Sequence, residues 1–528
     1  MKRNPENTKT LSRHLEENLQ VLKKDLGFGV NFDVLVREIR VASKDAVLIW
    51  IDGLTSDALI QRILDRLFDL PAGELVPDAA HKLIRQEVNF SEVETTDNLE
   101  YLIMRVLSGM AALLVDGEDE AVLMDVRSYP GRNPQEPDLE RVVRGSRDGF
   151  VETLVYNTAL IRRRLRDRSL RIEVLQVGNR SKTDVAILYL QDVVNLDLLK
   201  DVKDRISKIV TDGIPMAEKS VEEFITEKRN WWNPFPVVRY TERPDAAAIH
   251  LLEGHIVVLA DTSPSAIILP VTLFHHIQHA EEYRENPLVG AYLRWVRFLG
   301  ILTAWAFPPV WISLVFEKNA LPEWLKFIGP KTQTPIPIAL QFVVAEIGVD
   351  LIRIGLIHTP SSLATAIGFI GAILLGEMAT KVGLFVPETV MYVALAAIGT
   401  FATPSMEFSQ AIRLSRIFLL IVAGIFGFPG LAAGVAMVFL RLLTTRSFGV
   451  PYLWPLIPFE FGALKAVFVR LPVPSHWVRP SALKPQEVAR LPEGGGTASD
   501  RGAREAGDRR GDQKNKGTRT RTTKKGRR

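Results

Sequence analysis

Residues 298–316 read FLGILTAWAFPPVWISLVF, a run of nineteen residues without a charged side chain. Arg294 and Arg297 precede the run, and Glu317 and Lys318 follow it directly. A helix needs about 20 apolar residues to cross the hydrocarbon core of a bilayer. The run begins only after a long stretch of charged sequence of ordinary globular composition. The sequence therefore predicts a soluble N-terminal half followed by a helical half that crosses a membrane.

The C-terminal half contains further apolar segments, which lie at 338–357, 363–375, 389–403 and 417–440. The whole-chain values, 24% charged residues and a mean hydropathy of +0.09, hide this division because they average two unlike halves. We expect an all-α, multi-pass transmembrane domain at 286–446, followed by a membrane-proximal C-terminal segment at 447–490.

The soluble half contains two pairs of similar stretches. The runs DAVLIWID at 45–52 and DVAILYLQD at 184–192 align at an offset of 139, and a helical pattern follows each of them. The stretches SGMAALLVDG at 108–117 and EGHIVVLADT at 253–262 align at an offset of 145. Short apolar runs that alternate with helical periodicity are typical of strands covered by helices. The pairing predicts a duplicated α/β unit with 45–52 and 184–192 as equivalent strands.

We accordingly expect a helical lead-in at 1–27 and two related α/β subdomains at 28–145 and 146–285. The first ten residues are polar, so we expect no cleavable signal peptide. Trp231 and Trp232 could belong to an interfacial aromatic belt or to the core, and core packing is the expectation.

The end of the chain, residues 491–528, is rich in Gly, Arg and Lys. Residues 500–528 carry twelve Lys/Arg and four Asp/Glu, a net charge of +8, so the other residues sum to −4. A segment with so few large apolar residues cannot bury enough surface to fold. We expect a disordered polycationic tail on the membrane surface rather than a nucleic-acid arm.

The sequence contains none of the common catalytic signatures: no Gly-x-x-x-x-Gly-Lys-Ser/Thr loop, no Gly-x-Gly-x-x-Gly after a strand and no His-Glu-x-x-His. Helical spacing could bring His279 onto one face with His275 or His276. These histidines lie just before the membrane half, where His often faces headgroups or partners. Because the chain has no Cys, disulfides and thiolate metal sites are excluded. We expect no enzyme, no cofactor and no metal site.

The segment 338–357 carries three charged residues, Glu346, Asp350 and Arg353, at i, i+4 and i+7. This spacing places them on one helical face. Charged groups inside a span are costly and face a bundle interior or a water-filled path, often as pairs. We expect Asp350 and Arg353 to pair and Glu346 to remain the unpaired acid, with all three as candidates for an ion path. The alternatives are a tight network between helices and a polar interfacial helix.

The last apolar segment, 417–440, creates a problem of topology. Arg413 and Arg416 before it and Arg441 and Arg446 after it all favour the cytoplasmic side. A straight span cannot leave both of its ends on one side. Either the internal Gly-Phe-Pro-Gly sequence turns the segment into a re-entrant hairpin, or another segment fails to cross. We expect the N-terminal half and the C-terminal tail to be cytoplasmic.

The stretch 130–164 mixes charges of both signs, which is typical of an ion-pair network. We expect it to form an interface between subdomains or subunits rather than a catalytic site. The candidate interface residues are Arg132, Glu136, Arg144, Arg147, Asp148, Arg162, Arg163 and Arg164.

Several long motifs resemble the A subunit of the GerA family of spore germination proteins, over about residues 15–480. They are SYPGRNPQEPDLERVVRGSRDGFVETLVYNTALIRRR at 128–164, TERPDAAAIHLLEGHIVVLADTSPSAIILP at 241–270, AEIGVDLIRIGLIHTP at 345–360, FATPSMEFSQAIRLSR at 401–416 and PYLWPLIPF at 451–459. The sequence of residues 136–149 resembles most closely the stage V sporulation protein AF branch of the family.

This resemblance implies a multi-pass protein of the spore inner membrane that acts in endospore germination. It implies a homo-oligomer that passes monovalent cations, with membrane lipids and other germination membrane subunits as partners and with its N-terminal half and tail facing the spore core. An acidic face at Glu346 and Asp350 would suit cation passage. The alternatives are a non-conducting scaffold subunit, a secondary transporter and a membrane-anchored enzyme. No internal repeat of the apolar segments supports a transporter, and no catalytic constellation supports an enzyme.

Overall fold

A computed structural model describes the ranges 10–26, 28, 34–52, 54–71, 92–128, 136–137, 140, 142–143, 145–165, 167, 169–317, 321–325, 328–357, 368, 371, 373–470, 472 and 478–490. It divides into two compact units, Met1–Arg132 and Asn133–Arg528, and each is described by itself. The basic tail at 491–528 and most of the predicted segment 363–375 lie outside the described residues.

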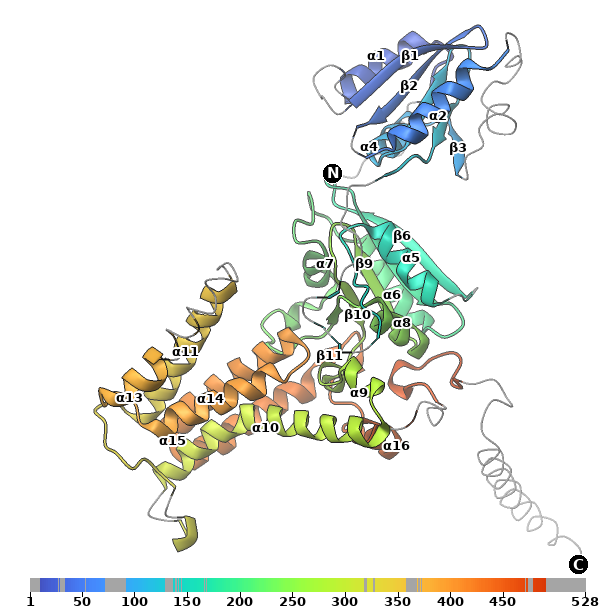
Figure 1. The fold of residues 1–528 in the computed structure, drawn as a ribbon. Coiled ribbons are helices and arrows are strands. Elements are labelled where there is room, and N and C mark those ends of the chain that lie inside the picture. The colour runs from blue at the N-terminus through green and yellow to red at the C-terminus, as the bar shows by residue number, and fades with distance from the viewer. Residues whose placement is uncertain are drawn as a thin grey trace, which may run out of the picture. The chain divides into compact units, whose positions relative to one another are not determined.

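The first unit is an antiparallel sheet with helices on both faces (Figure 1). Its elements are α1 Leu15–Leu26, β1 Val34–Val41, β2 Lys44–Ile51, α2 Asp57–Phe68, β3 Val93–Thr96, α4 Leu99–Leu107, β4 Ala111–Val115 and β5 Ala121–Met124. The strand order is β1-β2-β4-β5-β3. Even-numbered residues 46–50 of β2 pack with α2, whereas odd-numbered residues 47–51 pack with α1 and α4. Burial on both faces explains why β2 is continuously apolar.

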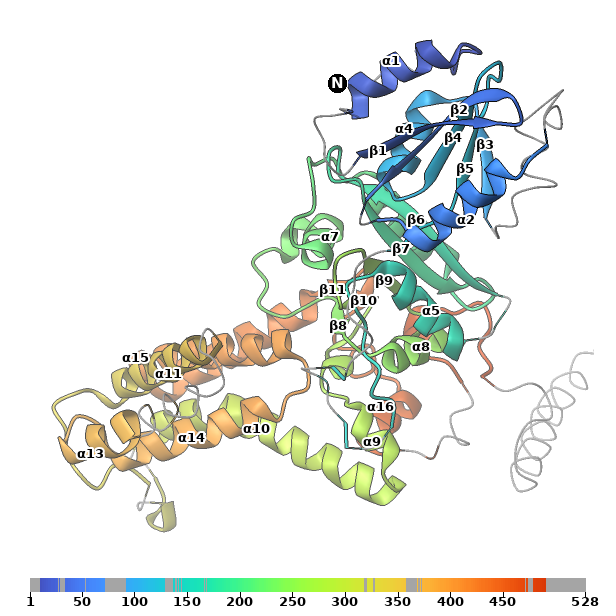
Figure 2. The same ribbon diagram turned by 45° about the horizontal axis from the view of Figure 1, so that its top comes forward.

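The second unit begins with a sheet of the same design (Figure 2). Its elements are α5 Leu154–Arg164, β6 Leu170–Val177, β7 Thr183–Leu190, α6 Leu196–Ser207, α7 Ala217–Ile225, β8 Arg239–Thr241, α8 Pro244–Glu253, β9 Ile256–Ala260 and β10 Ala266–Leu269. The strand order is β6-β7-β9-β10-β8, again antiparallel. Helices α6 and α7 cover one face of the sheet, and α5 and α8 cover the other.

The two sheets confirm the predicted duplication. Lys44 of β2 and Thr183 of β7 begin equivalent strands, and their positions differ by 139, the offset found in the sequence. The first residues of β4 and β9, Ala111 and Ile256, differ by 145, which is the second offset. Each sheet places these two strands side by side in its interior. The runs 45–52 and 184–192 are therefore equivalent strands of two related subdomains.

The C-terminal part of the second unit is helical. Its helices are α9 Ala280–Arg284, α10 Pro287–Phe316, α11 Ile338–Ile357, the π-helical turn Ile373–Met378, α13 Ala379–Lys381, α14 Pro387–Phe401, α15 Met406–Thr444 and α16 Phe461–Phe468. Among the described residues, α10 and α15 are long and apolar enough to cross a membrane, and α14 is a shorter apolar helix. Small residues let α10 and α14 approach closely, because a Cβ at Gly399 would lie only 2.2 Å from the carbonyl oxygen of Gly300.

Helix α15 is a helical hairpin that reverses at Gly427, whose φ and ψ are 62° and −141°. Leu419 and Val438 lie in one core cluster although they are far apart in the sequence. In a straight helix they would be about 28 Å apart. The Gly-Phe-Pro-Gly sequence thus produces the hairpin that was one of the two predicted alternatives. The turn residue is Gly427 rather than Pro429, because this backbone conformation is accessible almost only to glycine.

The segment after α15 returns to the second sheet subdomain. It contains β11 Arg446–Ser447, β12 Val450–Pro451, α16 and a 3₁₀ turn at Ser481–Leu483. The Ser447 hydroxyl accepts a hydrogen bond from the Val271 amide at 2.9 Å and donates to the Val237 carbonyl at 2.6 Å. At the other end of the hairpin, Phe408 in the first turn of α15 lies 6.4 Å from Phe235 between ring centroids, so both ends lie near this subdomain.

Trp231 and Trp232 do not pack in the core, which makes that prediction wrong. Their exposed fractions are 59% and 94%. They follow a 3₁₀ turn at Lys228–Asn230 and line a groove beside both arms of α15. Exposed tryptophans beside apolar helices are typical of a membrane interface.

Candidate functional site

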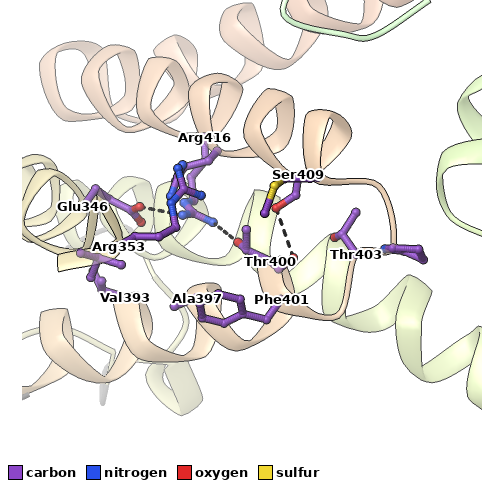
Figure 3. A pocket seen from close by; sticks show the side chains of 13 residues that line it. Glu346, Arg353, Val393, Ala397, Thr400, Phe401, Thr403, Ser409 and Arg416 are labelled. Carbon is purple, nitrogen blue, oxygen red and sulfur yellow. Dashed lines mark hydrogen bonds and ion pairs between the residues drawn. The ribbon is translucent and has the colours of Figure 1, made fainter. Parts of the chain in front are cut away.

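A buried ion pair joins α11 to the first arm of α15. The carboxylate of Glu346 lies 2.7 Å from Nη2 of Arg416, and both side chains are only 2% exposed (Figure 3). The prediction that Glu346 is the unpaired acid is therefore wrong. Its partner comes from a distant segment of the chain, and no periodicity within α11 could identify it.

Asp350 is shared between two arginines. It contacts Nη1 of Arg413, and its distance to Nη2 of Arg353 within the same helix is 3.8 Å. The predicted pair of Asp350 and Arg353 thus exists, but it is the longer of the two contacts. Arg353 also donates to the side-chain oxygen of Gln410 at 3.0 Å, which adds a second link to α15.

The guanidinium of Arg416 connects four helices. Besides Glu346 on α11, it reaches the carbonyl of Ala304 on α10 at 2.7 Å and the hydroxyl of Thr400 on α14 at 3.4 Å. Oε1 of Glu346 and Nε of Arg416 are buried and have no hydrogen-bond partner among the described residues. Buried polar atoms are almost always satisfied by protein or water, so these two atoms need water, an ion or another partner.

A cavity of about 200 Å³ lies against this cluster. Its charged wall contains Glu346, Arg353, Arg413 and Arg416, and its opposite wall comes from α14 and the turn into α15 (Figure 3). With Asp350 included, the cluster holds two acids and three arginines and carries one net positive charge. The cavity therefore has charged groups on one side and a mostly apolar lining elsewhere, and the fixed charge beside it is almost balanced.

The outer faces of the same helices are apolar. Leu351 of α11, Ile398 of α14 and Phe426 of α15 have exposed fractions of 65%, 66% and 65%. Exposed apolar patches on this scale mark a surface that meets lipid or another protein. The helical half thus combines a charged interior with an apolar exterior.

The predicted interface residues are only partly described. Arg132 and Arg144 lie outside the described residues, whereas Glu136, Arg147, Arg162 and Arg163 are exposed. Asp148 contacts Arg164 within the second subdomain. Burial alone would raise the pKa of Asp148, but hydrogen bonds from Arg164 and Ser146 lower the pKa below its usual value. The role of the predicted residues as an interface between subdomains or subunits stays a prediction.

The three histidines singled out from the sequence do not meet at one point. Residues 273–276 form a 3₁₀ turn rather than an α-helix, so the assumed helical spacing does not apply. His276 stacks on Phe408 with ring centroids 5.7 Å apart, and His279 caps α9. His275 instead lies beside His250 and His255, which the sequence reasoning did not select. The feature of the sequence that could have revealed this cluster is the duplicated hairpin of β9 and β10, because the hairpin brings the C-terminal end of α8 close to the end of β10.

Comparison with known proteins supplies the context for this geometry. The family described as Bacillus/Clostridium GerA spore germination protein matches residues 20–482. Stage V sporulation protein AF of Bacillus subtilis (strain 168) is 47% identical over 480 residues, covering 91% of this chain and 97% of that protein. Spore germination protein KA of the same organism is 29% identical over 488 residues, covering 91% of this chain and 88% of that protein.

A solved structure also aligns with part of the chain. It is the N-terminal domain of the A subunit of the Bacillus megaterium spore germinant receptor GerK3, which is 24% identical and covers 50% of this chain and 96% of that chain. The TM-score of this alignment is 0.20. The fold described above follows from the strand orders of the two sheets.

Proposed function

Because the chain belongs to the GerA family of spore germination proteins, we propose that it is a multi-pass membrane subunit of an oligomeric complex that releases monovalent cations during endospore germination. The observation that carries the proposal is the buried pair of Glu346 and Arg416 at the wall of a cavity between the helices. A bilayer-facing helix has no reason to bury a carboxylate unless a partner, water or a cation meets it.

The arrangement of charges supports a gated path rather than an open one. Glu346 and Asp350 each have an arginine partner, so the closed subunit offers almost no free negative charge. Separating Arg416 from Glu346 would expose a carboxylate to the cavity, and a carboxylate in a low-dielectric wall attracts cations. The proposed gating event is therefore a movement of the first arm of α15 relative to α11.

The hairpin also supports a particular orientation of the protein in the membrane. The second arm of α15 carries Arg441 in its last turn and leads to the exposed Arg446, and the exposed Trp231 and Trp232 of the second sheet subdomain lie beside this arm. Basic residues favour the cytoplasmic side, and exposed tryptophans favour the interface. In this proposal the sheet subdomains and the tail face the spore core, and the complex includes membrane lipids and other germination membrane subunits.

A non-conducting scaffold is the second candidate. Its supporting observation is the pairing itself, because Arg416 contacts α10, α11 and α14 and could serve only to hold the helices together. A scaffold would need the same buried pair but no path beside it.

Ion flux in liposomes separates the two candidates. We expect Glu346→Gln to lower cation flux or cation selectivity, because it leaves Arg416 to repel cations from the cavity. The double variant with Arg416→Gln removes both charges, and we expect it to restore stability but not selectivity. Glu377→Gln is the matched control, because Glu377 pairs with Lys381 on the exposed surface of the same helical half. Unchanged flux in Glu346→Gln together with a less stable assembly would favour the scaffold.

A further inference from the structure

Three histidines from three chain segments meet in the second sheet subdomain. His250 is in the last turn of α8, His255 immediately precedes β9, and His275 is in the 3₁₀ turn after β10. One ligand nitrogen from each ring lies within 4.8 Å of the other two. The ring centroid of His255 lies 5.0 Å from those of both His250 and His275. These distances place three imidazoles around one small volume.

Two of the rings are already held as a metal ligand would be. Nδ1 of His255 lies 2.7 Å from the carbonyl oxygen of Pro270, and Nδ1 of His250 lies 2.8 Å from that of Ala246. A carbonyl only accepts, so each Nδ1 carries the proton and each Nε2 presents a lone pair. This backbone contact on the second ring nitrogen is the usual support of a metal-bound histidine.

Among the described residues, no group donates a hydrogen bond to the lone pair on Nε2 of His255. Its Nε2 is buried without a hydrogen-bond partner, and the whole side chain is inaccessible. A neutral imidazole with a free lone pair is the form that binds metal.

We infer that His250, His255 and His275 form a zinc-binding site. The chain has no Cys, and three imidazoles with a fourth position for water are a known zinc ligand set. Ligand nitrogens in a tetrahedral site are roughly 3.3 Å apart for a Zn–N distance of about 2.05 Å, so the rings must close slightly. His275 must also move its proton, because its Nδ1 accepts from the Thr272 amide at 3.0 Å. With the proton on Nδ1, the Thr272 hydroxyl 2.9 Å away can accept a hydrogen bond from it. The Thr272 amide then loses its acceptor, which makes His275 the weakest ligand.

Nearby charges permit a cation at this point. Arg239 donates to the carbonyl of His275, but its charge is balanced by Glu140 at 3.2 Å. A carboxylate oxygen of Glu253 lies 4.0 Å from Nε2 of His255, and this carboxylate is paired with Arg490 at 3.5 Å. The zinc would join α8, β9 and the turn that leads to α9 and α10. It would therefore stiffen the connection between the sheet subdomain and the helical half, independently of ion conduction.

The test uses the full chain purified in detergent with an affinity tag that lacks histidine. After incubation with Zn²⁺ and dialysis against buffer containing Mg²⁺, we expect about one zinc to be retained per chain. His255→Gln should lose it, and His275→Gln should weaken its retention. His276→Gln and His14→Gln are the controls and should keep it, because His276 is equally buried but lies outside the cluster and His14 is on the surface.

Two measurements on the unsubstituted chain guard against variants that fail to fold. Zn²⁺ but not Mg²⁺ should raise its melting temperature, and Co²⁺ should give the intense visible absorption of a tetrahedral nitrogen site. Equal zinc retention by His255→Gln and the unsubstituted chain would overturn the inference. So would the absence of both retained zinc and a Zn²⁺-dependent shift, or a Co²⁺ spectrum with only weak octahedral bands.

Discussion

The first sheet subdomain and the helical half differ in where they place charge. In the first sheet subdomain, Arg105 and Glu94 form an ion pair at 2.8 Å with side chains 28% and 38% exposed, and none of its described buried residues is charged. In the helical half, Glu346 and Arg416 are buried, and large apolar side chains such as Leu351 point outward. The same physical rule acts in both regions, but the surrounding solvent differs.

Water solvates charges, so a soluble domain leaves them outside. Lipid solvates apolar groups, so a membrane domain can bury charge only where other polar groups compensate it. The reversal of pattern between the two regions thus supports the membrane assignment independently of helix length. It also predicts that equivalent substitutions have different consequences in the two regions.

The largest effect should come from stranding a charge in the helical half. Arg416→Met leaves Glu346 buried without its partner, and losing one member of a buried pair costs about 3–5 kcal/mol. We expect a large fall in the melting temperature of the helical half in detergent. Lys381→Met, which strands Glu377 on the surface, should cost about 0–1 kcal/mol. Similar costs for the two variants would remove the contrast between buried and exposed pairs.

The apolar cores of the sheets should respond next most strongly. Leu48 of β2 and Ile187 of β7 are fully buried, and the offset between the two sheets makes them equivalent in the duplicated fold. Either residue changed to Ala should cost about 2–5 kcal/mol. Hydrogen exchange should then accelerate in the substituted sheet and remain slow in the other, because each sheet has its own core. Loss of protection in both sheets from one substitution would contradict two separate cores.

A smaller effect is expected at the hairpin turn of α15. Gly427→Ala meets no close atoms, since its added Cβ would lie 3.6 Å from that of Phe316, but it would have to keep a positive φ. Such strain costs on the order of 1–3 kcal/mol. Gly355→Ala in α11 is the control, because that glycine has ordinary helical φ and open space. Its effect should be neutral or stabilising. A neutral Gly427→Ala would show that the reversal does not depend on this residue.

The sequence predicted the strands whose side chains are buried on both faces of a sheet. β2, β4, β7 and β9 are continuously apolar because helices cover both sides. The edge strands β1 and β6 escaped notice because exposed charged residues, such as Arg37 and Arg171, interrupt their apolar pattern.

The sequence predicted only the part of the candidate site that lies on a single helix. Helical periodicity placed Glu346, Asp350 and Arg353 on one face, which is a local property. Their partners Arg413 and Arg416 belong to another helix, and pairing between helices depends on packing that no single segment encodes. The histidine cluster was missed for the same reason, since its members come from three segments.

The central claim is that the charged interior of the helical half meets water while its apolar exterior meets lipid. Because the chain has no Cys, single cysteines can be introduced at Ala397, which lines the cavity, and at Leu351, which points outward. The measurement is the rate of reaction with a charged, membrane-impermeant thiol reagent in reconstituted vesicles. We predict rapid labelling at position 397 and little at position 351. Faster labelling at 351 than at 397 would contradict the account.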